Sequence, residues 1–113
     1  MLPKINRLKK KKDFEKVFKK GRGYKEDFLY LKIARNNLKN SRFGFIVSNK
    51  FSKKAVVRNK IRRRLKALTE IKLAKIKKGI DGVIIVNPGL EINDFWELEE
   101  RINKLFEKAG IIE

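Results

Sequence analysis

The sequence contains neither cysteine nor histidine. Without cysteine the chain can form no disulfide and no thiolate metal site, and without histidine it lacks the commonest general base and metal ligand. No apolar run approaches the ~20 residues that span a bilayer as a helix. The N-terminus passes into charge without the apolar stretch of ~7–15 residues that marks a secretory signal. We therefore expect a cytoplasmic protein with no membrane segment.

Acidic residues are scarce as well. The 113 residues include 31 Lys and Arg but only 13 Asp and Glu, for a formal net charge of +18, well beyond the magnitude of ~2–8 that keeps a small domain soluble. Residues 1–90 hold 28 basic and 6 acidic side chains, whereas residues 91–113 hold 3 and 7. Because self-repulsion at this level opposes compaction, the excess indicates a polyanionic partner, either nucleic acid or an anionic membrane surface. The C-terminal segment is expected to face away from it.

The chain nevertheless carries enough apolar material to fold. Hydrophobic residues make up 42% of it and include eight Phe, which is too much for a simple disordered tail. A length of 113 residues fits one domain. We therefore expect a single domain over residues 1–113, in which residues 1–12 form a partly flexible basic arm.

Periodicity predicts three helices and three strands. Phe14, Val17 and Phe18 recur at helical spacing before Gly21, a residue type that often follows a helix. Two aromatic and branched runs predict an antiparallel hairpin, and a compact apolar run predicts a central strand. In order, we expect a helix over 13–20, strands over 28–34 and 43–48, a helix from 53 that ends by 79, a strand over 83–86, and a helix from 95 that stops near 110. This order indicates an α+β fold, an α-β sandwich in which helices pack on a sheet.

The helix after Lys53 carries its charge on one side. Its apolar stripe consists of Val57, Ile61, Leu65 and Leu68. The opposite face carries Arg58, Asn59, Arg62, Arg63 and Lys66. A merely solvated face usually interleaves acidic residues to limit repulsion, yet no acid occurs between Asp27 and Glu70. We therefore interpret this face as RNA-binding, because guanidinium groups bind phosphate oxygens through two hydrogen bonds at once.

Aromatic residues near this charge are candidates for stacking on single-stranded bases, which is worth ~1–3 kcal/mol per base. The candidates are Phe14, Phe18 and Tyr30. Phe14 and Phe18 fall on one helical face, however, and a pair at that spacing more often belongs to a core. Spacing alone leaves both interpretations open. Lys50, Lys53 and Lys54 lead into the basic helix and either extend its potential or are ordinary loop lysines.

The sequence offers no recognisable active site. A nuclease without histidine needs clustered carboxylates that hold two metal ions, and the basic part of the chain has no such cluster. The richer acidic set, Glu91 to Glu100, lies on the segment expected to face away from a polyanion. No phosphate-binding or dinucleotide-binding glycine loop occurs. The residues therefore point to binding, with any chemistry supplied elsewhere.

Three segments are similar to one protein family. The stretch Ala55-Val-Val-Arg-Asn-Lys-Ile-Arg-Arg63 resembles the signature of the protein subunit of bacterial ribonuclease P. Asp13-Phe-Glu-Lys-Val-Phe-Lys-Lys-Gly21 resembles that family's first helix, and Gly44-Phe-Ile-Val-Ser-Asn-Lys50 resembles the strand before the signature. Length, charge and element order agree over nearly the whole chain.

The resemblance implies an α-β sandwich with a left-handed βαβ crossover, against the usual right-handed rule. It implies a partner, the catalytic RNA of ribonuclease P, and a substrate, precursor tRNA. The substrate's 5′ leader is removed hydrolytically with Mg²⁺ that is bound mainly by the RNA. The protein is then the non-catalytic subunit of a ribonucleoprotein endoribonuclease, and it is expected to be inactive alone.

The resemblance also assigns residues to two surfaces. The catalytic RNA is expected on Lys50, Lys53, Arg58, Asn59, Lys60, Arg62, Arg63 and Lys66, and the 5′ leader on Phe14, Phe18 and Tyr30. Asn59 is a candidate metal ligand, and no residue is expected to be catalytic. The chain departs from the family pattern at Lys60, where arginine is usual, in one extra residue between Lys50 and Arg58, and in a shorter loop after Gly21.

Two other functions are compatible with the charge. A structural RNA-binding protein, such as a small ribosomal protein, would carry a similar excess of cations. A DNA-binding helical module fits less well, because a strand rather than a helix-turn-helix partner follows the basic helix. We therefore expect RNA partners, with neither DNA nor a membrane bound.

Overall fold

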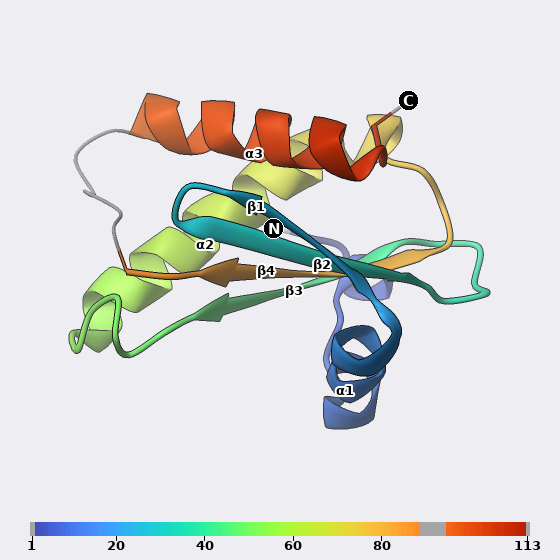
Figure 1. Cartoon of the computed structure of the whole chain (residues 1–113), viewed down its shortest axis with the longest axis horizontal. Coiled ribbons are helices and arrows are strands. Elements are labelled where there is room, and N and C mark those ends of the chain that lie inside the picture. Colours follow the sequence, from blue (N-terminus) through green and yellow to red (C-terminus); the bar gives the residue numbers. More distant parts are fainter. Residues whose placement is uncertain (1, 89–94, 113) are drawn as a thin grey trace.

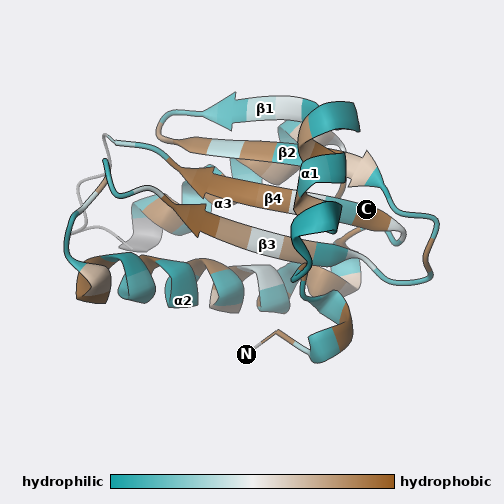
Figure 2. Ribbon diagram, turned by 90° about the horizontal axis from the view of Figure 1, so that it is seen from below, coloured by the Kyte–Doolittle hydropathy of each residue, from teal (hydrophilic) through white to brown (hydrophobic). Residues whose placement is uncertain are grey.

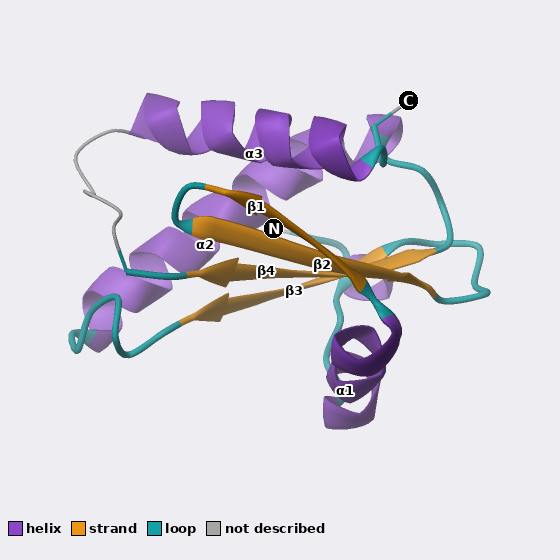
Figure 3. Ribbon diagram, viewed as in Figure 1, coloured by secondary structure: helices purple, strands orange, loops and turns teal. Residues whose placement is uncertain are grey.

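The computed structural model describes residues 2–88 and 95–112, which form a four-stranded sheet with helices on both of its faces (Figure 1). In chain order, the elements are the 3-10 helix η1 (Lys4–Asn6), α1 (Lys11–Lys20), β1 (Arg22–Glu26), β2 (Leu29–Arg35), β3 (Arg42–Val47), α2 (Ala55–Lys72), the 3-10 helix η2 (Leu73–Lys75), β4 (Ile80–Val86) and α3 (Phe95–Ala109). All six predicted elements are present. The structure also contains β1, a strand that precedes β2 in the chain (Figure 3). We did not predict β1, because its sequence Arg-Gly-Tyr-Lys-Glu contains no apolar run.

The strands are ordered β1-β2-β4-β3 across the sheet. β2 pairs antiparallel with β1 and with β4, while β3 pairs in parallel with β4. The predicted hairpin between residues 28–34 and 43–48 is therefore wrong, because β4 lies between those two strands. The prediction that residues 83–86 belong to a central strand is confirmed. The side chains of β4 are apolar on both faces of the sheet, so the strand is stable where other residues cover both faces. Between β2 and β3, the backbone of β4 also has hydrogen-bond partners on both sides.

α2 connects the parallel neighbours β3 and β4. Seen from the α1 side in Figure 2, both strands run to the left with β4 above β3, and the buried residues of α2 pack on the far face together with α3. This is a left-handed crossover, as the resemblance implied, whereas ~98% of such units are right-handed. α2 packs on β3, which is an edge strand, so its polar face is open to solvent beside the sheet.

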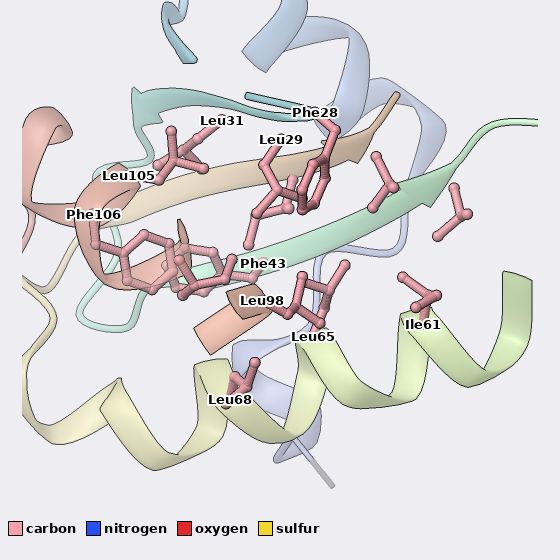
Figure 4. Packing of buried hydrophobic residues seen from close by; sticks show 14 of the residues in the cluster. Phe28, Leu29, Leu31, Phe43, Ile61, Leu65, Leu68, Leu98, Leu105 and Phe106 are labelled. Carbon is pink, nitrogen blue, oxygen red and sulfur yellow. The ribbon is translucent and has the colours of Figure 1, made fainter. Parts of the chain in front are cut away.

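Apolar clusters hold the sheet between its helices. The larger cluster lies on the side of α2 and α3 and includes Phe43 and Phe106, whose ring centroids are 6.1 Å apart (Figure 4). The smaller cluster lies on the α1 side and joins Leu8 and Val17 to Val83. Successive residues of β4 alternate between the two clusters, as strand geometry requires. α1 is therefore anchored to the sheet by a small contact and leaves much of that face uncovered.

The segment before α1 packs against the sheet. Leu2 and Leu8 are buried, and the N–H of Leu8 donates a 3.0 Å hydrogen bond to the carbonyl of Phe43. Nε of Arg7 donates to the carbonyl of Leu2 at 2.7 Å. That residues 1–12 form a partly flexible arm stays a prediction, but Leu2 and Leu8 attach this segment to the sheet by apolar burial and by pairing with β3. The lysine-rich pattern of the segment concealed both contacts.

Glycines end two helices for different reasons. Gly21 follows α1 as predicted, but its φ is −78°, so it does not adopt the left-handed conformation. A Cβ there would clash with the carbonyl of Val17 and lie 2.8 Å from that of Ile33, so the glycine permits close approach of β2. Gly110 has a φ of 68° and ends α3, as glycine favours. At the other end of α3, the sequence Asp94-Phe-Trp-Glu97 resembles a capping box, but Asp94 lies outside the described residues.

α3 carries much of the chain's negative charge and pairs it locally. Arg101 donates a 2.7 Å hydrogen bond to Glu97, and Lys104 lies 3.4 Å from Glu100. The helix packs on the face of the sheet opposite α1. In the described part of the chain, no helix is both long enough and apolar enough to cross a membrane.

Candidate nucleic-acid interface

α2 has one buried face and one polar face, as its periodicity predicts. Ile61, Leu65 and Leu68 are buried in the larger cluster. On the polar face, Asn59, Lys60 and Arg63 are exposed, and Arg58, Arg62 and Lys66 are half-buried. No acidic residue occupies the first turn, so the positive end of the helix dipole adds to the charge of the side chains.

Arg58 also organises the loop that precedes α2. Its Nη1 donates a 2.8 Å hydrogen bond to the carbonyl of Ser52. Within the same loop, the N–H of Lys50 donates a 3.0 Å hydrogen bond to Oγ of Ser48. These bonds hold the exposed side chains of Lys50 and Lys53 beside the start of the helix. Arg58 therefore has a structural bond as well as guanidinium nitrogens that remain available to a ligand.

A shallow hollow of about 430 Å³ lies on the polar face of α2. It is lined by Val56, Asn59, Arg62, Arg63 and Lys66. Nη1 of Arg62 donates a 2.6 Å hydrogen bond to Oδ1 of Asn59, which fixes that guanidinium on the helix surface. Two guanidinium groups and an ammonium group around one hollow suit the phosphate oxygens of a nucleic acid.

A second hollow connects α2 to α1. It lies between the N-terminal segment, β3 and α2, and it shares Arg62 and Lys66 with the first hollow. Phe14 from α1 and Phe45 from β3 also line it. Sequence reasoning missed Phe45, because it shares one face of its strand with the buried Phe43 and Val47 and so resembles a core residue. Only the position of β3 at the edge of the sheet leaves this ring partly open.

Phe14 and Phe18 lie on the α1 side of the sheet, but they are exposed to different degrees. Phe18 is 37% exposed. Phe14 is half-buried, and its ring lies over Gly44, where any Cβ would clash with it. Phe14 therefore combines the two interpretations left open by the sequence: it anchors α1 and also borders a hollow. Phe18 is the better placed of the two to stack on a base.

Tyr30 faces the same side as these two rings. Its neighbours Leu29 and Leu31 are buried in the larger cluster, so strand alternation directs Tyr30 toward the α1 side. The ring lies across Gly23 of the neighbouring strand, where a Cβ would clash with it. The structure thus brings all three predicted aromatic residues to one face of the sheet.

Two lysines that we did not predict add positive charge to this face. Nζ of Lys32 donates a 2.6 Å hydrogen bond to the carbonyl of Phe18. Lys25 stands opposite Tyr30 in the β1–β2 ladder and is exposed. Alternation along β2 would have found Lys32, since it lies two residues after Tyr30. Lys25 could not be placed, because β1 itself was not predicted.

Two carboxylates on the α1 side, those of Asp13 and Asp81, are bound to one cation. Arg42 forms two hydrogen bonds with Asp81, which is 4% exposed, and lies 3.4 Å from Asp13 of α1. The hydrogen bond with Asp81 raises the pKa of Arg42 above its ordinary value. These acids therefore serve as structural partners of Arg42.

The described side chains do not form a clustered metal site. Within residues 2–88 and 95–112, no group of three or more Asp, Glu, His or Cys is placed to hold a metal ion. The oxygen of the candidate ligand Asn59 faces the guanidinium of Arg62, and that positive charge opposes the binding of a second cation there.

Comparisons with known proteins agree with this architecture. The family model Ribonuclease P matches residues 2–110. The ribonuclease P protein component of Synechocystis sp. is 40% identical over 114 residues, which cover 99% of this chain and 91% of that protein. The solved ribonuclease P protein of Thermotoga maritima has a TM-score of 0.82 and 31% identity, with 90% of this chain and 96% of that chain covered.

A further solved structure, the ribonuclease P protein of Staphylococcus aureus, has a TM-score of 0.88 at 23% identity and covers 96% of this chain and 98% of its own. That likeness shows the shared fold. The match to the family model spans nearly the whole chain, and these comparisons do not favour the alternative of a small ribosomal protein. The chain therefore belongs to the ribonuclease P protein family, the protein component of an endoribonuclease ribonucleoprotein that processes the 5′ leader of tRNA.

Proposed function

We propose that the protein assembles with the catalytic RNA of ribonuclease P through α2 and the loop before it, and binds the single-stranded leader of precursor tRNA beside α1. The residues proposed for the catalytic RNA are Lys50, Lys53, Arg58, Asn59, Lys60, Arg62, Arg63 and Lys66. Those proposed for the leader are Phe14, Phe18 and Tyr30, together with Lys32. The RNA performs the hydrolysis, and the protein positions the two RNAs relative to each other.

One observation carries the proposal: the cationic face of α2 and the aromatic face beside α1 are continuous. The hollows on the two faces share Arg62 and Lys66. Cations on α2 suit the phosphates of a folded RNA, whereas exposed rings suit the unpaired bases of a single strand. A protein with both on adjoining surfaces can hold a folded RNA and direct a single strand away from it.

The aromatic face also accounts for a preference for substrate over product. Precursor and mature tRNA differ by the leader, so a contact with the leader is made by the precursor alone. One stacked base is worth ~1–3 kcal/mol, which corresponds to roughly 5- to 150-fold in affinity. Phe18 therefore has the capacity to favour precursor tRNA by about this factor.

Mg²⁺ is part of this proposal as an ion bound by the RNA partner. The described side chains offer it no cluster of ligands, so the protein's contribution is to bring RNA segments together by neutralising their phosphates. The cytoplasm is the proposed compartment, because tRNA precursors must meet the enzyme there.

Reconstitution tests the proposal. The purified protein alone should leave precursor tRNA intact, and adding it to the catalytic RNA at low Mg²⁺ should raise the cleavage rate. Lys66→Gln, on α2, should reduce this stimulation. Lys104→Gln removes the same charge from α3, outside both proposed surfaces, and should retain it. The proposal fails if the wild-type protein does not stimulate cleavage.

A further inference from the structure

A second group of cations lies at the end of the sheet opposite the start of α2. The parallel strands β3 and β4 finish at the same end of the sheet, and α2 begins there, after β3. At the other end, β1 and β4 begin and β2 finishes (Figure 1). Five basic residues gather there, and we call them the distal basic group: Lys20, Arg22, Arg35, Lys77 and Lys78.

The distal basic group surrounds two adjoining hollows. Lys20, Arg22 and Arg35 line one of about 480 Å³, whose lining also includes Ile33 and Ile80. The other, of about 320 Å³, is lined by Arg35, Asn37, Lys77, Lys78, Gly79 and Ile80. Arg35 borders both hollows and stands opposite Ile80 in the β2–β4 ladder. The cations thus line hollows that they share with apolar side chains, unlike lysines spread over a convex surface.

The charge of this group is not compensated within the part of the chain that the structure describes. All five side chains are exposed, and none forms an ion pair with a described acid. Asp81, at the start of β4, is buried and bound to Arg42. By contrast, Arg101, Lys104 and Lys108 on α3 are all paired with acids. Like charges held close together without acids repel one another, and a polyanion relieves that repulsion.

We propose that the distal basic group binds the phosphate backbone of RNA, as a contact separate from α2 and from the aromatic face. The assignment to RNA rests on the proposed function, in which both partners of the protein are RNAs. Arg22 and Arg35 offer guanidinium groups that bind phosphate oxygens bidentately. The backbone belongs either to a second segment of the catalytic RNA or to leader nucleotides beyond Phe18, because Lys20 and Arg22 directly follow α1 in the chain. The protein then holds RNA at both ends of its sheet.

Salt dependence of binding tests this contact, because each neutralised phosphate adds ~0.7–0.9 to the slope of log affinity against log salt. Arg35→Gln and Lys78→Gln are compared, singly and together, with Lys104→Gln, which removes the same charge from α3. In one arm, the full-length protein binds transcribed catalytic RNA. In the other, the assembled enzyme binds precursor tRNAs with a short and a long leader. Hydrogen exchange confirms that each variant keeps the fold.

We expect each single substitution to lower the slope by about 0.7–0.9 and the double substitution to lower it by about twice as much. A change in the first arm identifies the catalytic RNA, and a change confined to the long leader identifies the leader. Slopes in both arms that match those of Lys104→Gln would overturn the inference. The first arm needs no cleavage, so a wild-type protein that binds RNA but stimulates nothing would count against the proposed function alone.

Discussion

Arg42 and Asp81 stand directly opposite each other in the parallel β3–β4 ladder, and their side chains are joined by hydrogen bonds of 2.9 and 2.7 Å. Asp81 is 4% exposed and also accepts a 2.8 Å hydrogen bond from Asn36. The same guanidinium lies 3.4 Å from Asp13 on α1. One arginine thus ties α1 to two strands of the sheet, and the position of α1 sets that of Phe18.

Replacing Arg42 with methionine should lower the free energy of unfolding by about 3 kcal/mol, because a buried carboxylate loses its charged partner. Asp13→Asn should cost less than about 1 kcal/mol, since its contact is longer and partly exposed to solvent. Chemical denaturation measures both changes. Similar losses in the two variants would show that Asp81 is not the principal partner of Arg42.

Phe18→Ala should weaken binding of precursor tRNA to the assembled enzyme by roughly 5- to 150-fold, the equivalent of one lost stacking contact. Binding of mature tRNA should be unchanged, because it has no leader. Equilibrium binding of both tRNAs measures the difference. If both lose affinity equally, the ring does not contact the leader.

Phe14→Ala should behave differently from Phe18→Ala. Because the ring of Phe14 packs on Gly44, its removal should lower the free energy of unfolding by about 2 kcal/mol, less than the ~3–5 kcal/mol of a fully buried phenylalanine. Phe18 is more exposed, and its removal should cost under about 1 kcal/mol. Thermal or chemical unfolding of the two variants gives this ranking, and a reversed order would show that α1 is anchored through Phe18.

Arg58→Ala should weaken assembly with the catalytic RNA about tenfold or more, because hydrogen bonds to charged groups are worth ~1.5–3 kcal/mol. It should also speed amide hydrogen exchange in the loop of residues 48–54, since the bond to the carbonyl of Ser52 is lost. Arg58→Lys keeps the charge without the planar guanidinium. Its affinity for the catalytic RNA should therefore lie between those of the wild-type protein and of Arg58→Ala. Weaker assembly with unchanged exchange would assign Arg58 to RNA contact alone.

The ion pair of Glu26 with Lys108 should make the junction of β1 and α3 sensitive to acid. The hydrogen bond from Lys108 lowers the pKa of Glu26 below its ordinary value of 4.5. A lowered folded-state pKa means that the pair stabilises the fold above the unfolded-state pKa and that this stabilisation is lost as pH falls through the folded-state pKa. Carbon-13 titration of the Glu26 carboxyl should show the low midpoint, and Lys108→Gln should raise it. An unchanged midpoint would show that the pair does not persist in solution.

Local patterns predicted the helices well. Apolar spacing identified the buried stripe of α2 and thereby its cationic face, because helix geometry alone decides which residues share a side. The same spacing could not decide whether Phe14 belongs to a core or to a binding surface. The packing of Phe14 on the sheet depends on Gly44, a residue 30 positions later that leaves room for the ring.

Pairing between strands was the weakest part of the prediction. Two successive strand-like runs suggested a hairpin, but β4 separates β2 from β3, since its apolar residues need cover on both faces. We also missed β1, because its sequence is polar and the strand is held by backbone hydrogen bonds to β2. The first error concerns contacts between distant residues, on which local periodicity carries no information. The second concerns a local hairpin, whose outer strand has too few apolar residues to show the alternation typical of a strand.

The sequence by itself indicated a polyanionic partner and determined that α2 presents cations on one face. These properties follow from charge count and from the geometry of single helices. Only the tertiary structure decided that Tyr30 shares a face with α1, that Arg62 and Lys66 join the two surfaces, and that Arg22 meets Arg35 at the far end of the sheet. The first and third depend on how β1 and β2 pair and which side of the sheet carries the larger cluster, and the second depends on the left-handed crossover that places α2 beside β3. Burial of the whole core sets all of these.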